Sequence, residues 1–171
     1  PASQKYVASN WACFKSGRSK LPSLKIYPKR RDEKPMKKIA IFADVQNIYY
    51  TTRDEFRRPF NYRKLWQKLI KQGDIVVANA YAINKGDDQQ IKFQDALKHM
   101  GFEVKLKPYI QRRDGSAKGD WDVGIAIDMM EVSASGEVDT VILLSGDGDF
   151  DMLLNKVKQA YGMHTEVFGV L

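Results

Sequence analysis

The stretch VILLSGDGDFDMLL, residues 141–154, contains a strand, a turn and the start of a helix. Its first four residues are all apolar, which is typical of a short strand buried on both faces. Ser145 and Gly146 then end the apolar run, and the apolar residues that follow recur at helical spacing. Carboxylates close together in sequence repel one another when they are ionised, so the fold must supply a counter-charge, a helix end or solvent. Three aspartates lie between this strand and this helix: Asp147, Asp149 and Asp151.

The same alternation of apolar runs and amphipathic stretches extends through the chain from residue 39. Strands are expected at residues 39–43, 75–83, 102–110, 140–144 and 163–170. Helices are expected at residues 62–72, 87–100, 121–133 and 149–161. Strands that alternate with helices form right-handed βαβ units. The sequence therefore predicts the α/β class, with three layers (α/β/α) around a central, mostly parallel sheet.

Residues 1–36 differ in composition from the rest of the chain. They contain four of the six prolines, no sustained apolar periodicity and a run of six charged residues at positions 29–34. Proline and the lack of a pattern are typical of extended, weakly ordered segments. We therefore expect a basic, proline-containing N-terminal arm at residues 1–36, followed by one α/β domain at residues 37–171.

The net charge of +7 is distributed unevenly along the chain. Residues 1–37 carry ten basic and two acidic side chains, so much of the excess belongs to the arm. Residues 38–118 carry sixteen basic and nine acidic side chains, whereas residues 119–171 carry two basic and ten acidic ones. A nucleic-acid-binding surface produces such an asymmetry, and so does chance segregation of solvated faces. Charge alone leaves both explanations open.

Composition also bounds the cellular setting. The single cysteine, Cys13, excludes a disulfide within the chain and fits a reducing compartment. No apolar run approaches the roughly 20 residues that a membrane helix needs, and the first residues lack the apolar core of a secretory signal. We expect a soluble, cytoplasmic protein that does not bind membranes.

Carboxylates follow two of the expected strands directly. Asp44 ends the first strand, and Asp147 follows the strand at residues 140–144. The carboxyl ends of parallel strands meet at one edge of the sheet, where ligands bind. Asp122 lies in the first turn of a helix and within the apolar stripe that faces the sheet, whereas Asp128 lies outside that stripe and is expected to be solvated. Asp44, Asp122 and Asp147 are therefore expected at the same edge.

Three carboxylates at one edge need a cation to screen their repulsion. Mg²⁺ and Mn²⁺ are hard ions that prefer oxygen ligands, and we expect one of them to be held by Asp147. For Asp149, capping of the following helix is an equal alternative. Asp120 and Asp151 are expected to cap helix ends or to place negative charge in a first turn, rather than to bind metal.

Three motifs occur in a fixed order along the chain: IAIFADVQN at residues 39–47, KGDWDVGIAID at residues 118–128 and VILLSGDGDF at residues 141–150. Together they resemble the NYN domain family, and more narrowly its LabA-like branch, a relative of the PIN-domain nucleases. This resemblance implies a PIN-like, Rossmann-like fold and a Mg²⁺- or Mn²⁺-dependent endoribonuclease whose metal is held by acids. Carried over by motif, the metal ligands are Asp44, Asp122, Asp147 and Asp149, and the catalytic set adds Asn47.

A ribonuclease also holds its substrate along the phosphate backbone, which requires Lys or Arg beside the acidic centre. Basic residues of this kind are expected in loops after the first three strands: Arg53, Arg57, Arg58, Lys85, Arg112, Arg113 and Lys118. The aromatic residues of the same segments either stack on bases or pack the loops: Tyr49, Tyr50, Phe56 and Tyr109. Single-stranded or structured RNA is the expected partner.

Two other functions compete with the nuclease. Residues 146–153 resemble the last motif of haloacid-dehalogenase-type phosphatases, in which Asp44 would be the nucleophile. Such enzymes need an acid two residues after the nucleophile and a threonine two residues further on, and this chain has Gln46 and Ile48 there. A non-catalytic RNA-binding module with the same fold remains an open alternative.

Overall fold

The computed structural model describes residues 36–84, 86–108, 110–111, 117–118 and 120–170, with the backbone alone at residues 110, 111, 117 and 118. Apart from Met36, the N-terminal arm expected at residues 1–36 lies outside the described residues. The helices and strands of the described residues all belong to the α/β domain, and the division into an arm and a domain stays a prediction.

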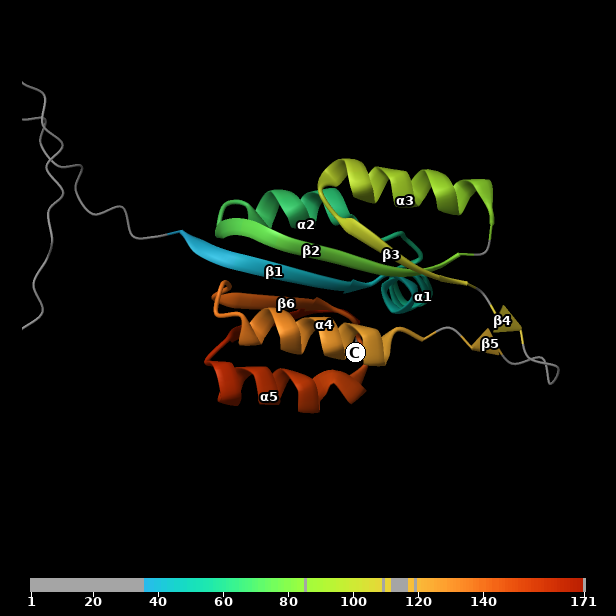
Figure 1. The fold of residues 1–171 in the computed structure, drawn as a ribbon. Coiled ribbons are helices and arrows are strands. Elements are labelled where there is room, and N and C mark those ends of the chain that lie inside the picture. Colours follow the sequence, from blue (N-terminus) through green and yellow to red (C-terminus); the bar gives the residue numbers. More distant parts are fainter. Residues whose placement is uncertain (1–35, 85, 109, 112–116, 119, 171) are drawn as a thin grey trace, which may run out of the picture. The chain divides into compact units, whose positions relative to one another are not determined.

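The domain is built on a sheet of five parallel strands in the order β3-β2-β1-β6-β7 (Figure 1). Their bounds are β1 Lys37–Asp44, β2 Gly73–Asn84, β3 Glu103–Pro108, β6 Thr140–Leu144 and β7 His164–Phe168. The chain first adds β2 and β3 on one side of β1, and later adds β6 and β7 on the other side. The order of the strands therefore reverses between β1 and β6.

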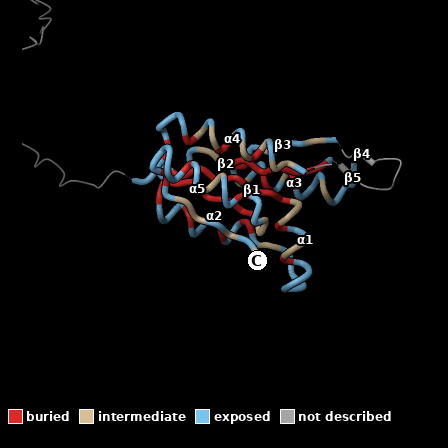
Figure 2. Tube along the Cα trace, turned by 90° about the horizontal axis from the view of Figure 1, so that it is seen from below, coloured by how far each residue is buried: buried red, intermediate tan, exposed pale blue. Residues whose placement is uncertain are grey.

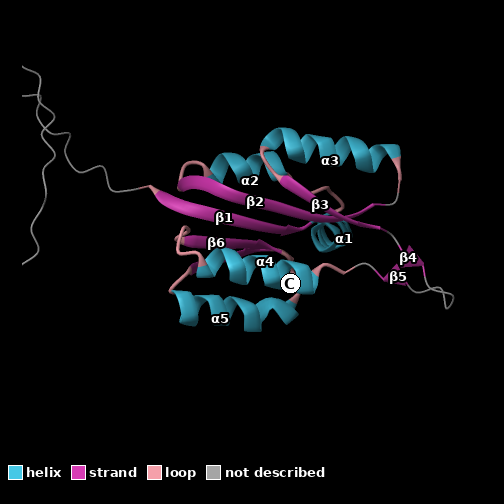
Figure 3. Cartoon of the chain, viewed as in Figure 1, coloured by secondary structure: helices cyan, strands magenta, loops and turns pink. Residues whose placement is uncertain are grey.

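Helices cover both faces of this sheet. They are α1 Val45–Phe56, α2 Tyr62–Leu69, α3 Asp88–Met100, α4 Asp122–Ala134 and α5 Asp151–Tyr161, with a short 3₁₀ helix η1 at Gly148–Phe150. Figure 3 shows α2 and α3 on one side of the sheet and α4 and α5 on the other. The predicted three-layer α/β/α architecture is thus confirmed. Within the described part of the chain, no helix is long and apolar enough to cross a membrane.

Two apolar clusters, one on each face of the sheet, form the core. Successive residues of β1 alternate between them: Ile41 packs with α1, α2 and α3, whereas Phe42 packs with α4 and α5. Both side chains are fully buried, and burial of a side chain of this size contributes roughly 1.5–3 kcal/mol. Figure 2 shows buried positions running along the central strands. This two-sided burial explains why the strand segments are apolar without alternation.

The structure corrects the expectation of a loop after the first strand. Residues 45–56 form helix α1, and the Asp44 carboxylate caps it by accepting a hydrogen bond from the Asn47 amide at 3.0 Å. Arg53 therefore lies on a helix, while Arg57 and Arg58 follow its end. Its buried residues are Val45, Ile48 and Thr52, so the face that packs on the core includes a polar residue and does not form a purely apolar stripe.

Among the other boundaries that differ from expectation, two follow the carboxyl ends of β3 and β6. The third strand ends at Pro108, and beyond it β4 (Ile110–Gln111) pairs antiparallel with β5 (Ala117–Lys118) in a separate ribbon. Proline lacks an N–H group and cannot continue a hydrogen-bonded ladder. The last helix begins at Asp151 rather than Asp149, because η1 precedes it.

Candidate functional site

The candidate site lies at the carboxyl edge of β1 and β6. In parallel α/β sheets, ligands bind outside the carboxyl ends of the strands, where the strand order reverses. Here β1 and β6 are neighbours on either side of that reversal. Asp44 is the last residue of β1, and Asp147 follows β6 after Ser145 and Gly146. Asp44 and Asp147 therefore lie at the same edge of the sheet, as predicted.

Asp44 is the most buried carboxylate of this group, with 8% of its surface exposed. The pKa of Asp44 is raised to about 6, chiefly by burial and in smaller part by the carboxylates of Asp122 and Asp147. Backbone hydrogen bonds from Asn47 and Gln46 act in the opposite direction. The ionised form of Asp44 is consequently unfavourable unless positive charge is brought to the site.

The loop after β6 is shaped by its glycine. A Cβ atom at Gly146 would lie 2.0 Å from the carbonyl oxygen of Val170, so no larger residue fits. The Asp147 amide donates to Ser145 Oγ at 3.2 Å, and the Asp147 carboxylate caps η1 by accepting from the Asp149 amide at 3.0 Å. Close backbone packing and two local hydrogen bonds therefore define the position of Asp147.

Asn47 connects the two segments that carry these carboxylates. Its side-chain Oδ1 accepts a hydrogen bond from the Gly146 amide at 2.9 Å, across 99 positions of sequence. The first turn of α1, which Asp44 caps, is thereby joined to the loop that carries Asp147. Asn47 thus positions Asp44 and Asp147 relative to each other.

Asp122 is the first residue of α4 and is partly exposed. Burial raises its pKa, and the carboxylates of Asp120, Asp147 and Asp149 raise it further, while Lys107 lowers it. The expectation that Asp120 caps α4 is wrong, because the cap residue is Trp121 and no side-chain capping bond is present. The carbonyl oxygen of Asp120 instead accepts a hydrogen bond from Lys107 Nζ at 2.9 Å.

The chemistry of this donor set fits a hard divalent cation. Asp147 raises the pKa of both Asp44 and Asp122, and Asp122 raises that of Asp44, so these carboxylates repel one another and together attract positive charge. Among the residues that the structure describes, no three Asp, Glu, His or Cys side chains lie together as the ligands of one ion do. An ion shared by all three aspartates therefore requires their side chains to rotate toward it.

The two remaining aspartates of this segment, Asp149 and Asp151, lie in the first turns of η1 and α5. Asp149 lies exposed in η1, where the capping contact is made by the Asp147 side chain. Asp151 is the first residue of α5, as expected for negative charge in a first turn.

Lys107 is a residue of the site that sequence reasoning missed. Its Nζ lies 4.3 Å from the ring centroid of Trp121, and its charge lowers the pKa of Asp122. Lys105 and Lys107 are two residues apart on β3 and therefore share one face. That alternation was the available signal, because it places both lysines on the same side of β3.

The structure describes only some of the basic residues that were predicted to bind RNA. Arg53 Nη1 donates to Tyr49 Oη at 2.9 Å, and its guanidinium lies 5.8 Å from the centroid of the Tyr49 ring. Arg57 and Arg58 are exposed at the end of α1. Several candidates lie outside the described residues: Lys85, Tyr109, Arg112 and Arg113. Lys118 lies in β5, where the backbone alone is described.

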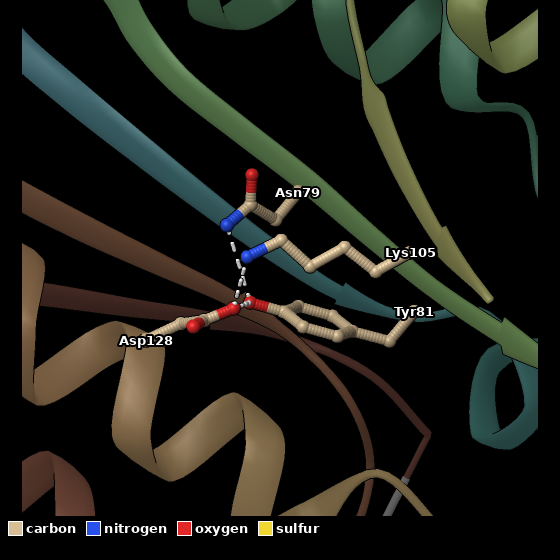
Figure 4. Close-up of polar contacts among 4 residues, drawn as sticks. All are labelled: Asn79, Tyr81, Lys105 and Asp128. Carbon is tan, nitrogen blue, oxygen red and sulfur yellow. Dashed lines mark hydrogen bonds and ion pairs between the residues drawn. The ribbon is translucent and has the colours of Figure 1, made fainter. Parts of the chain in front are cut away.

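A second polar cluster, on the α4 face of the sheet, corrects the expectation that Asp128 is solvated. The Tyr81 hydroxyl and Lys105 Nζ each donate to Asp128 Oδ2 at 2.6 Å (Figure 4). Burial opposes ionisation of Asp128, but the bonds from Lys105 and Tyr81 outweigh it and lower the pKa of the carboxyl. Tyr81 is fully buried, and Asn79 Nδ2 donates to its oxygen at 3.2 Å. This cluster ties α4, the helix that begins at Asp122, to β2 and β3.

Asp128→Ala is expected to lower the free energy of unfolding by about 2 kcal/mol, because it leaves the buried Tyr81 hydroxyl without an acceptor and Lys105 without its counter-charge. Urea unfolding at neutral pH measures the change. Glu131→Ala, at an exposed position of the same helix, is the matched control and should cost less than about 0.5 kcal/mol, the usual limit for surface changes. Equal losses in the two variants would contradict a structural role for Asp128.

Comparisons with known proteins find relatives along nearly the whole domain. The model of the NYN domain family matches residues 38–170. An uncharacterized protein of Methanocaldococcus jannaschii is 32% identical over 144 residues, which make up 82% of this chain and 52% of that protein. The low amplitude and bright protein LabA of Synechococcus elongatus is 28% identical over 129 residues, 71% of this chain and 68% of LabA. The chain thus spans about half the length of the archaeal relative.

A solved structure is also similar. The crystal structure of a protein of unknown function from Vibrio parahaemolyticus has a TM-score of 0.74 and 50% sequence identity, and the match covers 81% of this chain and 85% of that chain.

Proposed function

The chain belongs to the NYN domain family of RNA-associated, nuclease-like proteins, in its LabA-like branch, and we propose that it is a Mg²⁺- or Mn²⁺-dependent endoribonuclease. One observation carries this proposal. Asp44, Asp122 and Asp147 interact electrostatically at the reversal of strand order, where their mutual repulsion favours a divalent cation.

Hydrolysis of a phosphodiester needs an activated water, an in-line approach and neutralisation of charge on the phosphate. When bound, a divalent cation lowers the pKa of a coordinated water and neutralises phosphoryl oxygens. Asp44, Asp122 and Asp147 would hold it, with Asp149 beside them. Asn47 keeps the segments of Asp44 and Asp147 together through the Gly146 amide.

The substrate's backbone requires cations around this acidic centre. Lys107 is already placed beside Asp122 by its bond to the carbonyl of Asp120, and Arg57 and Arg58 lie exposed after α1. In our proposal these side chains contact phosphates on either side of the cut bond, without reading the bases.

The test is incubation with single-stranded and structured RNA in Mn²⁺ or in EDTA, alongside a generic phosphomonoester. Cleavage of RNA that EDTA abolishes supports the nuclease. Turnover of the monoester alone would instead support a phosphatase, and RNA binding without any turnover would support a non-catalytic module.

Lys107→Gln is expected to weaken RNA binding about equally for unrelated sequences and to reduce the slope of log K against log salt by about one, because one phosphate contact is lost. Lys71→Gln is the matched control, since Lys71 is exposed two residues before β2, at the opposite edge of the sheet. Binding curves of both variants and the wild type at several salt concentrations measure this slope. A loss confined to one RNA sequence, with an unchanged slope, would contradict phosphate contact.

A further inference from the structure

A cavity of about 470 Å³ lies between α1 and α3, beside the end of β2. Gln46, Tyr49 and Tyr50 of α1 line one side, and Phe93 and Gln94 of α3 line the other. The lining begins at Val45, the residue directly after Asp44, so the cavity adjoins the acidic site. Its volume is within the range of roughly 300–1,000 Å³ that is usual for small-ligand pockets.

Gln94 is the feature of this cavity that packing does not explain. Its side chain is 5% exposed, and its Nε2 has no hydrogen-bond partner among the described residues. A buried donor without an acceptor destabilises a fold, and such groups are rare in proteins. An apolar residue of similar size would fill this position at no such cost. The Nε2 atom is itself enclosed, so an acceptor on a ligand in the cavity satisfies it only when the Gln94 side chain turns toward the cavity.

Aromatic side chains line both sides of the cavity. Tyr49 and Tyr50 are about half exposed, with ring centroids 5.3 Å apart in an edge-to-face arrangement. Arg53 holds the Tyr49 ring through a hydrogen bond to its hydroxyl and lies over its face. Phe93 of α3 is 37% exposed, and its ring lies against the ring of the buried Tyr62, with 5.7 Å between the centroids. The rings are therefore fixed while part of their surface stays accessible.

We propose that this cavity holds one unstacked base of the RNA, with Tyr49 against its face and the Gln94 side chain turned so that its amide hydrogen-bonds to the edge of the base. The inference rests on the proposed function, since RNA cut beside Asp44 brings a neighbouring nucleotide to the cavity. The lining chemistry favours a base over a phosphate. Four glutamine amides, each a donor and an acceptor, line it together with one carboxylate, Asp87. Its cation, Arg53, is engaged with Tyr49.

The test uses short RNAs in which one nucleotide at a time is abasic. Binding is measured in Ca²⁺, with electrophoresis to verify that the RNA stays intact. For the wild-type protein, an abasic residue at one position is expected to weaken binding about tenfold, the loss of one stacked and hydrogen-bonded base. In Gln94→Leu this position-specific loss should shrink to below about threefold, while the Tm of the unliganded protein rises by about 3 °C.

Matched controls keep the test decisive. Gln67→Leu makes the same change at an exposed position of α2 and should behave as the wild type. Tyr49→Leu, at the exposed rim, should also remove the position-specific loss, whereas Tyr161→Leu at the end of α5 should not. RNA that is bound and cut with equal losses at every abasic position would overturn the base pocket and leave the nuclease standing. A failure to bind any RNA would overturn both.

Discussion

Asp147→Asn is expected to remove the Mn²⁺-dependent rise in Tm and to lower RNA cleavage by about 100-fold or more. Loss of a supporting group that only orients a metal ligand already costs about 10–100-fold in metal affinity or activity, and loss of a direct ligand should cost at least as much. In EDTA, however, the variant should be as stable as the wild type or more so. Asparagine retains the oxygen that accepts from the Asp149 amide and caps as well as aspartate does, while one charge leaves a repelling group.

Melting curves of both proteins with and without millimolar Mn²⁺ measure this, because an ion that binds the folded state alone raises Tm by mass action. Asp151→Asn, four residues further on at the start of α5, is the control and should keep the metal response. An equal Mn²⁺ shift in Asp147→Asn and the wild type, or no shift in the wild type, would show that Asp147 does not bind metal.

The metal-free protein is expected to lose stability as the pH rises from about 4 to about 6. The folded-state pKa of Asp44 is raised from 3.8 to about 6, so the folded protein binds more protons than the unfolded chain across this window. Stability therefore falls with increasing pH and levels off above pH 6. A shift of this size corresponds to about 2–3 kcal/mol. Asp44→Asn should remove the fall and be more stable than the wild type at pH 7.

Urea unfolding in EDTA at pH 4, 5, 6 and 7 tests this prediction. Asp74→Asn, at the start of β2 and the opposite edge of the sheet, is the control and should follow the wild type. Adding Mn²⁺ at pH 7 should restore the lost stability in the wild type and have little effect in Asp44→Asn. If the stability of the wild type and of Asp44→Asn changed with pH in the same way, the raised pKa of the Asp44 carboxyl would be contradicted.

The sequence by itself determined the sheet and the place of the acidic edge. Uniformly apolar runs such as residues 141–144 follow from burial on both faces, and their alternation with helices requires parallel strands. Since all carboxyl ends of parallel strands meet at one edge, the chain positions of Asp44 and Asp147 were enough to bring them together. These inferences succeed because strand and helix periods are local properties.

Tertiary structure alone decided which partners these elements meet. Helix α1 packs against β1 and β2, and its buried face includes the polar residue Thr52. Asp128 lies outside the apolar stripe of α4, yet it accepts hydrogen bonds from Tyr81 on β2 and Lys105 on β3, which are 47 and 23 residues away. Gln94 is the converse case: it is polar, yet tertiary packing buries it in α3, and the helical pattern gives no reason for a polar group there. The physical reason is that periodicity shows which face of a helix or strand is covered, whereas the packing of distant elements determines which residues cover it.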